Sequence, residues 1–175
     1  MKNRIGHYCI SFLCTAGGIL LDRLTKNWAV FALKGTSAIP VIPDILELTY
    51  VENRGAAFGM MQGKQTFFLL LTAVISAAIV YILTRIPLKK RMLPCTACLV
   101  AVLAGAIGNL IDRTLQGYVV DFIYFKPIDF PVFNVADIFV TCGMFILMAL
   151  LVFYYKDEDL SWLEKPKKHT DEGIS

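Results

Sequence analysis

The sequence predicts an all-α membrane protein, a bundle of four transmembrane helices with a small β element on its outer surface. Hydrophobic residues fill 57% of the 175 positions and the mean hydropathy is +0.61, far above that of a soluble domain of this length. Four apolar runs approach the roughly 20 residues that cross the hydrocarbon layer, which predicts spans near 8–33, 67–84, 92–111 and 136–155. We expect one membrane domain, 1–156, followed by a charged tail, 157–175.

The distribution of cations predicts the orientation of the spans. Lys and Arg are concentrated at both ends of the chain and in the loop between the second and third runs. Such cations are retained on the cytoplasmic side, so both termini are predicted to be cytoplasmic. The basic start resembles a secretory signal, but the first run continues to Leu33 without an A-x-A site, and we expect it to remain. The net charge of +3 arises from these flanks and gives no case for nucleic-acid binding.

The two outer loops contain the predicted β element. Residues 46–52 alternate apolar and polar side chains, which favours an extended strand, and Gly55 follows where a turn is needed. Val119 and Val120 give residues 117–122 of the other outer loop a β-branched character, which predicts a second short strand. Pro127 and Pro131 then exclude a long helix before the fourth span.

Ionisable residues interrupt the apolar runs toward the predicted outer half of the membrane. Each is costly in hydrocarbon unless it is paired or faces water, so each is a candidate functional residue. Helical spacing groups Asp22 with Lys26 and Asn109 with Asp112, and Arg113 follows directly. Small residues at positions 101, 105 and 108 predict close packing of the third span against a neighbour. For Asp22, Asn109 and Asp112, interhelical bonding with a purely structural role remains open.

Two further carboxylates flank the start of the fourth span. Asn134 can cap that helix, and Asp137 then falls in its first turn, where the helix dipole favours a negative charge. Asp121 lies between Val120 and Phe122, which suggests burial. Two neighbouring carboxyl groups share a proton, so that one activates a water molecule while the other bonds a scissile carbonyl. Capping alone is the ordinary alternative for Asp137.

Other hydrolytic chemistries lack their parts in this sequence. The two histidines, His7 and His169, are terminal and lie on the wrong side in the predicted topology, so Ser-His or Cys-His activation is unsupported. Cys95 and Cys98 form a C-x-x-C within an apolar run, without a second pair or a nearby histidine. We therefore expect metal-free aspartyl hydrolysis without a cofactor.

Five ordered sequence blocks resemble the lipoprotein signal peptidase (signal peptidase II) family. They are DRLTK at 22–26, NRGAAF at 53–58, GAIGNLIDR at 105–113, GYVVDF at 117–122 and FNVAD at 133–137. Two departures are Arg23, where the family commonly has Gln, and Ala104 in place of the first glycine of a pair. Neither touches the candidate carboxyl pair.

The resemblance implies a site, a substrate and a location. The implied catalytic residues are Asp121 and Asp137, and the implied supporting residues are Asp22, Lys26, Asn53, Gly55, Asn109, Asp112, Arg113, Asn134 and Ala136. The implied reaction removes the signal peptide of a diacylglyceryl-modified prolipoprotein before its lipidated cysteine. The implied structure is an inner-membrane bundle with an outer β cradle and a short outer helix, in contact with membrane lipids, and we expect a monomer.

Two other functions use the same features. A small proton-coupled transporter would use Asp22, Asp112 and Asp137 as relay groups, but it needs acids spread through the membrane. A non-catalytic scaffold that binds lipoproteins would differ from the enzyme only in forming no product. The gathering of the acids toward one face favours a reaction site near the outer surface.

Overall fold

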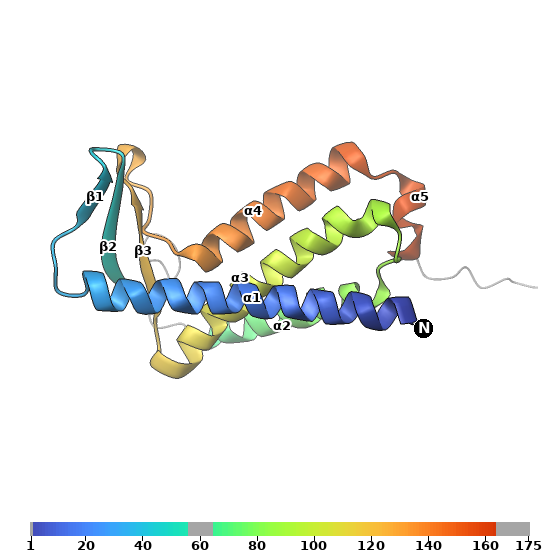
Figure 1. Ribbon diagram of the computed structural model, residues 1–175, viewed down its shortest axis with the longest axis horizontal. Helices are drawn as coiled ribbons and strands as arrows, with labels where there is room; N and C mark the ends of the chain where they lie inside the picture. The colour runs from blue at the N-terminus through green and yellow to red at the C-terminus, as the bar shows by residue number, and fades with distance from the viewer. Residues whose placement is uncertain (1, 56–64, 164–175) are drawn as a thin grey trace, which may run out of the picture.

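The computed structural model describes residues 2–55 and 65–163 of the chain and consists of long helices with a small sheet at one end (Figure 1). The long helices are α1 (Lys2–Leu33), α2 (Gln65–Arg85), α3 (Leu93–Gln116) and α4 (Val135–Ala149), and α4 continues as a π-helical turn, Leu150–Tyr154. The strands are β1 (Ile39–Ile42), β2 (Leu46–Asn53) and β3 (Val119–Phe125). The N-terminus and the short helix α5 (Asp157–Leu160) lie at the end opposite the sheet.

Helix α3 is the centre of the bundle, as its small residues predicted. It packs against α1, α2 and α4, and it contributes most of the buried helical residues. Gly105 and Gly108 permit the close approach, since a Cβ would lie 2.3 Å from the Ala136 carbonyl oxygen at Gly105 and 2.6 Å from Asp22 Oδ2 at Gly108. Ala101 differs, because it lines an open groove beside α1.

The sheet is antiparallel with strand order β1-β2-β3, and it covers the end of the bundle where α1 finishes. The predicted strands at 46–52 and 117–122 are both present, although β3 begins two residues later because Gly117 adopts a left-handed conformation that ends α3. Asp121 pairs with Val51 in the register of β2 and β3, and Asn53 pairs with Val119. This register brings residues of the two outer loops together.

Three of the long helices are long and apolar enough to cross a membrane: Arg4–Leu33, Lys90–Gln116 and Val135–Tyr154. In α2 the apolar part that the structure describes, Leu69–Arg85, is shorter. A helix lies at each predicted span. Helix α1 begins six residues earlier than predicted, α2 is longer at both ends, α3 ends five residues later, and α4 with its π-helical turn agrees to within one residue. The short outer helix implied by the resemblance stays a prediction, because residues 56–64 of the first outer loop lie outside the described chain.

The chain from residue 157 onward begins with structure that the sequence did not predict. Residues 157–163, the first part of the predicted charged tail, form α5 and a 3₁₀ turn, Ser161–Leu163. Leu160 and Trp162 pack against the apolar core, and Asp159 pairs with Arg91 at 2.8 Å. These contacts order the segment because they bury apolar surface of Leu160 and Trp162.

Candidate active site

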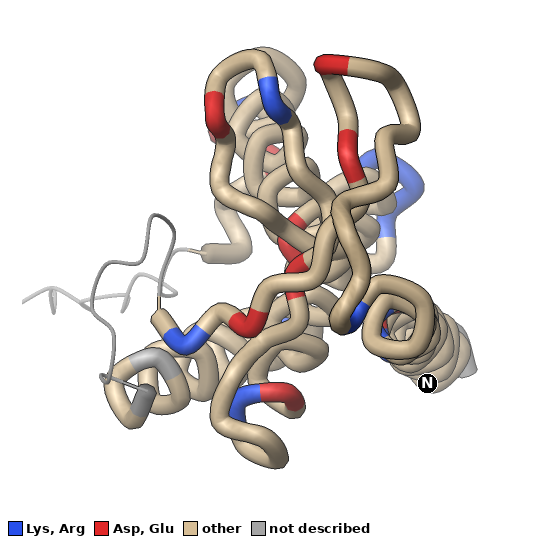
Figure 2. The backbone as a smooth tube through the Cα atoms, turned by 90° about the vertical axis from the view of Figure 1, so that its left-hand side faces the viewer, with Lys and Arg blue, Asp and Glu red and all other residues tan. Residues whose placement is uncertain are grey.

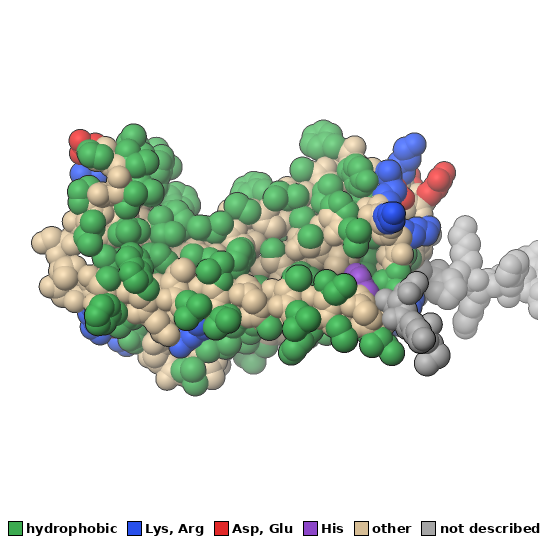
Figure 3. Space-filling view, viewed as in Figure 1, with side chains coloured by type: hydrophobic (Ala, Val, Ile, Leu, Met, Phe, Trp, Pro, Cys, Tyr) green, Lys and Arg blue, Asp and Glu red, His purple; other side chains and the backbone are tan. Residues whose placement is uncertain are grey.

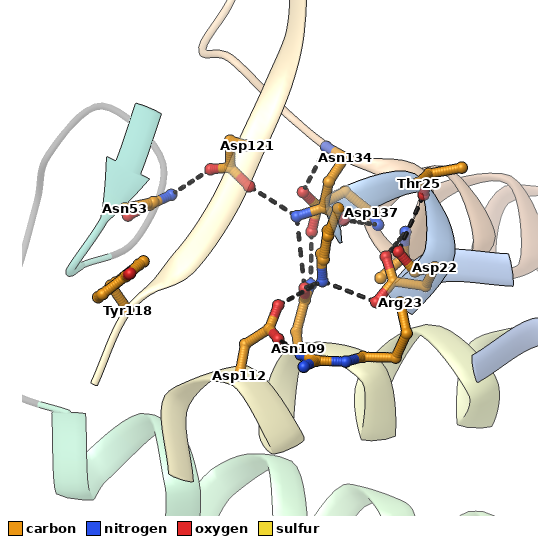
Figure 4. A network of polar contacts seen from close by, with 12 residues as sticks. Asp22, Arg23, Thr25, Asn53, Asn109, Asp112, Tyr118, Asp121, Asn134 and Asp137 are labelled. Atoms are coloured by element: carbon orange, nitrogen blue, oxygen red, sulfur yellow. Dashed lines mark hydrogen bonds and ion pairs between the residues drawn. The ribbon is translucent and has the colours of Figure 1, made fainter. Parts of the chain in front are cut away.

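The candidate residues meet where the C-terminal halves of α1 and α3, the start of α4 and strands β2 and β3 converge. Viewed from the sheet end, acidic residues of separate elements gather near the centre of the molecule (Figure 2). The close view shows one continuous polar network across these elements (Figure 4). The network therefore depends on tertiary packing, since its members are up to 114 positions apart.

Lys26 is the hub of the membrane side of this network. Its ammonium contacts Asp22 Oδ2 at 2.7 Å, Asp112 Oδ2 at 2.7 Å and Asn109 Oδ1 at 2.8 Å. The Lys26 side chain is 2% exposed and both aspartates are fully buried, so the charges are compensated within the protein. Arg23 also pairs with Asp112. The spacing of Asp22 and Lys26 on one helical face is confirmed.

Asn109 links Lys26 to Asp137 at the start of α4 through two hydrogen bonds of its side-chain amide. Because its Oδ1 accepts from Lys26, its Nδ2 is directed to Asp137 Oδ1, at 2.8 Å. Asp22 Oδ1 accepts from the backbone N–H of Ala136 at 3.0 Å, which ties the first turn of α4 to α1. Ala136 itself is fully buried. Together these contacts hold the N-terminus of α4 in one position.

Asn134 connects the two candidate carboxylates. It is the predicted N-cap of α4: its Oδ1 accepts from the Asp137 N–H at 3.0 Å, and its own N–H donates to Asp137 Oδ2 at 3.1 Å. Its Nδ2 donates to Asp121 Oδ1 at 2.6 Å. Asn134 therefore bonds both acids: Asp121 on strand β3 and Asp137 in the first turn of helix α4.

The surroundings of Asp121 favour its protonated form. Asp121 is 2% exposed and accepts from Asn53 Nδ2 at 2.8 Å through its second oxygen. Burial, followed by the charge of Asp137, raises the pKa of Asp121 to about 7, while the amides of Asn53 and Asn134 act in the opposite direction. Asp137 is less buried than Asp121, lies in the first turn of α4, and accepts from an amide and from a backbone N–H. The two carboxyl groups therefore have unlike environments.

Both carboxyl groups line one cavity of about 450 Å³. Asn53, Gly55 and Arg113 also line it, and Arg113 is within electrostatic range of both acids. The remaining predicted residues lie behind this wall as its buried support: Asp22, Lys26, Asn109, Asp112, Asn134 and Ala136. All the predicted site residues are therefore brought together. Among residues 2–55 and 65–163 there is no group of three His, Cys, Asp or Glu residues that could hold a metal ion.

The apolar wall of the cavity was not assigned residue by residue from the sequence. Residues 130–133 (FPVF), together with Ile138, Thr141 and Cys142 of α4, form its apolar side. An apolar segment in a loop outside the membrane was one signal for this wall. Thr141 lies one helical turn after Asp137, so helical spacing was the other. The cavity thus joins a polar acidic end to an apolar wall.

Comparison with known proteins agrees with this arrangement. The family model for signal peptidase (SPase) II matches residues 14–153. A protein named lipoprotein signal peptidase from Caldanaerobacter subterraneus subsp. tengcongensis is 48% identical over 77% of this chain and 90% of its own length. The protein of the same name from Clostridium acetobutylicum is 44% identical over 82% of this chain and 94% of its own.

Solved structures give the same result for the fold. One bacterial membrane enzyme solved at 1.9 Å resolution has a TM-score of 0.72 and 35% identity, covering 83% of this chain and 94% of its own. A second, at 2.3 Å resolution, has a TM-score of 0.71 and 34% identity over 90% and 93%. The chain therefore belongs to the signal peptidase II family and is a membrane peptidase.

Proposed function

We propose that the chain is an aspartic endopeptidase that removes signal peptides from diacylglyceryl-modified prolipoproteins, with Asp121 and Asp137 as its catalytic pair. The observation that carries this proposal is the shared cavity, which two carboxyl groups from different elements line with unlike surroundings. One acid is buried on a strand and favours its proton, and the other receives several donors at a helix start. That asymmetry is what acid–base division between two aspartates requires.

The reaction would use both carboxyl groups on one peptide bond. Asp137, as carboxylate, takes a proton from a water molecule whose oxygen attacks the scissile carbonyl carbon. Protonated Asp121 donates to the carbonyl oxygen as the tetrahedral intermediate forms. The intermediate collapses when the C–N bond breaks, the leaving nitrogen takes the proton held by Asp137, and Asp121 regains its own from the hydroxyl. Asn109 and Asn134 hold the carboxylates, and Arg113 favours the net negative charge.

The form of the cavity supports a lipid-modified peptide as substrate. A relative that is 48% identical to this chain is named lipoprotein signal peptidase. An extended peptide would bring its scissile bond to the carboxyl groups, while an acyl chain would lie against residues 130–133 and Ile138. Residues of β2, β3 and the start of α4 line this cavity, beside the sheet at the end of the long helices, and this position fits a substrate that enters sideways from the bilayer.

We further propose that residues 1–156 are one inner-membrane domain, active as a monomer, with α2 as the fourth span. The 21 residues of α2 are long enough for that role. The N-terminus and α5 lie at the same end. Arg85 at the end of α2 and Lys89 and Lys90 before α3 are also there, because Arg4 and Tyr8 of α1 contact Thr84. This arrangement supports two cytoplasmic termini and a site near the outer face. The buried ionisable groups of the long helices, Asp22, Lys26 and Asp112, lie together with Asp137 toward the sheet end, an arrangement that suits a reaction site better than a transport path.

The test is cleavage of a diacylglyceryl-modified precursor by the purified chain, read as a mobility shift and as the mass of the released peptide. Asp121→Asn and Asp137→Asn should each lose cleavage by several orders of magnitude while still binding precursor. Asp157→Asn, an exposed acid on α5, is the matched control and should retain full activity. Normal turnover in Asp137→Asn would exclude the mechanism, and wild-type protein that binds precursor without product would be a scaffold.

A further inference from the structure

A second groove lies between α1 and α3, on the other side of α4 from the catalytic cavity. It consists of two cavities of about 440 and 380 Å³ that share His7, Ile10, Leu93 and Thr96 in their walls. Phe139 of α4 closes it, whereas the catalytic cavity uses Ile138, Thr141 and Cys142. The proposed reaction has no use for this groove.

The groove changes in chemistry along its length. Its larger cavity is apolar and is lined by small residues of both helices, including Cys14, Gly18, Ala97, Ala101 and Ala104. Ile10 is both a wall residue and 64% exposed, so the groove borders the apolar face of α1 that the bilayer would cover. The smaller cavity forms a mouth at the end where α2 connects to α3.

This mouth is cationic. Lys89 and Lys90 line it, and neither is in an ion pair within the described part of the chain, although Lys89 lies within electrostatic range of Asp159. His7 stands at the junction of the two cavities, and its Nε2 is buried without a hydrogen-bond partner among the described residues. Charged side chains gather at the ends of the molecule, while the long face between them is mostly apolar (Figure 3). The groove thus joins an acyl-sized slot to a basic interfacial end.

We propose that this groove binds one anionic phospholipid from the leaflet at the Lys89 and Lys90 end. Its acyl chain lies between α1 and α3, and its phosphate accepts from His7 Nε2 and faces the two lysines. The same lysines argue against the signal peptide as occupant, because a signal peptide carries a positively charged region next to its apolar segment. The proposal does not depend on the peptidase activity.

The test is lipid retention by the full chain, purified in detergent, stripped of lipid and measured by native mass spectrometry. Phosphatidylglycerol should bind one to one and more tightly than zwitterionic phosphatidylcholine. Each lysine removed, in Lys89→Gln and Lys90→Gln, should weaken phosphatidylglycerol binding about fivefold, the order expected for one cation near an anionic surface. Lys156→Gln, at the same end but outside the groove, is the charge-matched control and should not change it.

A plugging variant tests the apolar part of the groove. Ala97 is exposed and lines the slot, so Ala97→Phe should fill it and abolish one-to-one binding without a folding cost. Ala77→Phe, at an exposed position of α2, is its control. Equal retention of the two lipids, or full retention in Ala97→Phe, would overturn the proposal. If full lipid retention in Ala97→Phe is accompanied by a raised KM for precursor, the groove holds peptide and not lipid. The lysine variants decide the question if Ala97→Phe does not fold.

Discussion

Asp121→Asn should change the stability of the protein with opposite sign at low and high pH. The pKa of Asp121 is raised from 3.8 to about 7, so the folded protein holds this proton more tightly than the unfolded chain. The favourable contribution is complete below pH 4 and is lost as pH rises toward 7. Raising the pKa of Asp121 from 3.8 to about 7 amounts to a penalty of the order of 4 kcal/mol above pH 7.

Asparagine removes that penalty but has a cost of its own. Both oxygens of Asp121 accept amide N–H groups, from Asn53 and Asn134, so the new –NH₂ faces a donor and one bond is lost, at about 1–3 kcal/mol. The variant should therefore be about 1–3 kcal/mol more stable than wild type at pH 8 and less stable by a similar amount at pH 4. At about 2–4 °C per kcal/mol, the difference in Tm should cross zero between these values.

The assay is thermal unfolding of both proteins in the same detergent from pH 4 to pH 8.5. Asp157→Asn is the control for removal of an exposed carboxylate and should give a small difference with no crossing. A Tm difference for Asp121→Asn that keeps one sign and size across this range would refute the reasoning. It would mean that Asp121 titrates as an ordinary solvated acid and is not suited to hold the catalytic proton.

Three other changes test the same site. Cleavage, measured as kcat/KM, should fall about tenfold per pH unit above pH 7 as Asp121 loses its proton. Asn53→Leu removes a hydrogen bond to the charged form of Asp121 and should move this fall in activity to higher pH. An unchanged pH profile in Asn53→Leu would contradict the role of Asp121 as the proton donor. Gly105→Ala places a methyl group 2.3 Å from a backbone oxygen of α4 and should lower stability by about 1–3 kcal/mol, whereas Gly17→Ala meets no atom within 4 Å and should not. Lys26→Met leaves the buried carboxylate of Asp22 uncompensated, while Asp112 keeps its ion pair with Arg23. It should lower stability by about 3–5 kcal/mol in thermal unfolding, and a neutral result would show that the cluster is solvated.

The helices and the cap of α4 could be predicted because their causes are local. Apolar runs of sufficient length predicted α1 to α4, and Asn134 predicted the cap that places Asp137 in the first turn. Alternation in residues 46–52 predicted β2 in the same way. The continuation of structure through residue 163 was missed, because Leu160 and Trp162 form no pattern of their own and are held by the core they contact.

For the site, the sequence by itself determined which residue types were present and which family they resemble. It did not determine that Asn53 and Asn134 would both bond Asp121, or that Lys26 would orient the amide of Asn109 toward Asp137. Those contacts join residues 13 to 83 positions apart, so they exist only after α1, α3, α4 and the sheet have packed. The unlike surroundings of the two carboxyl groups follow from that packing, because burial and donor placement are properties of the assembled fold and leave no periodicity in the chain.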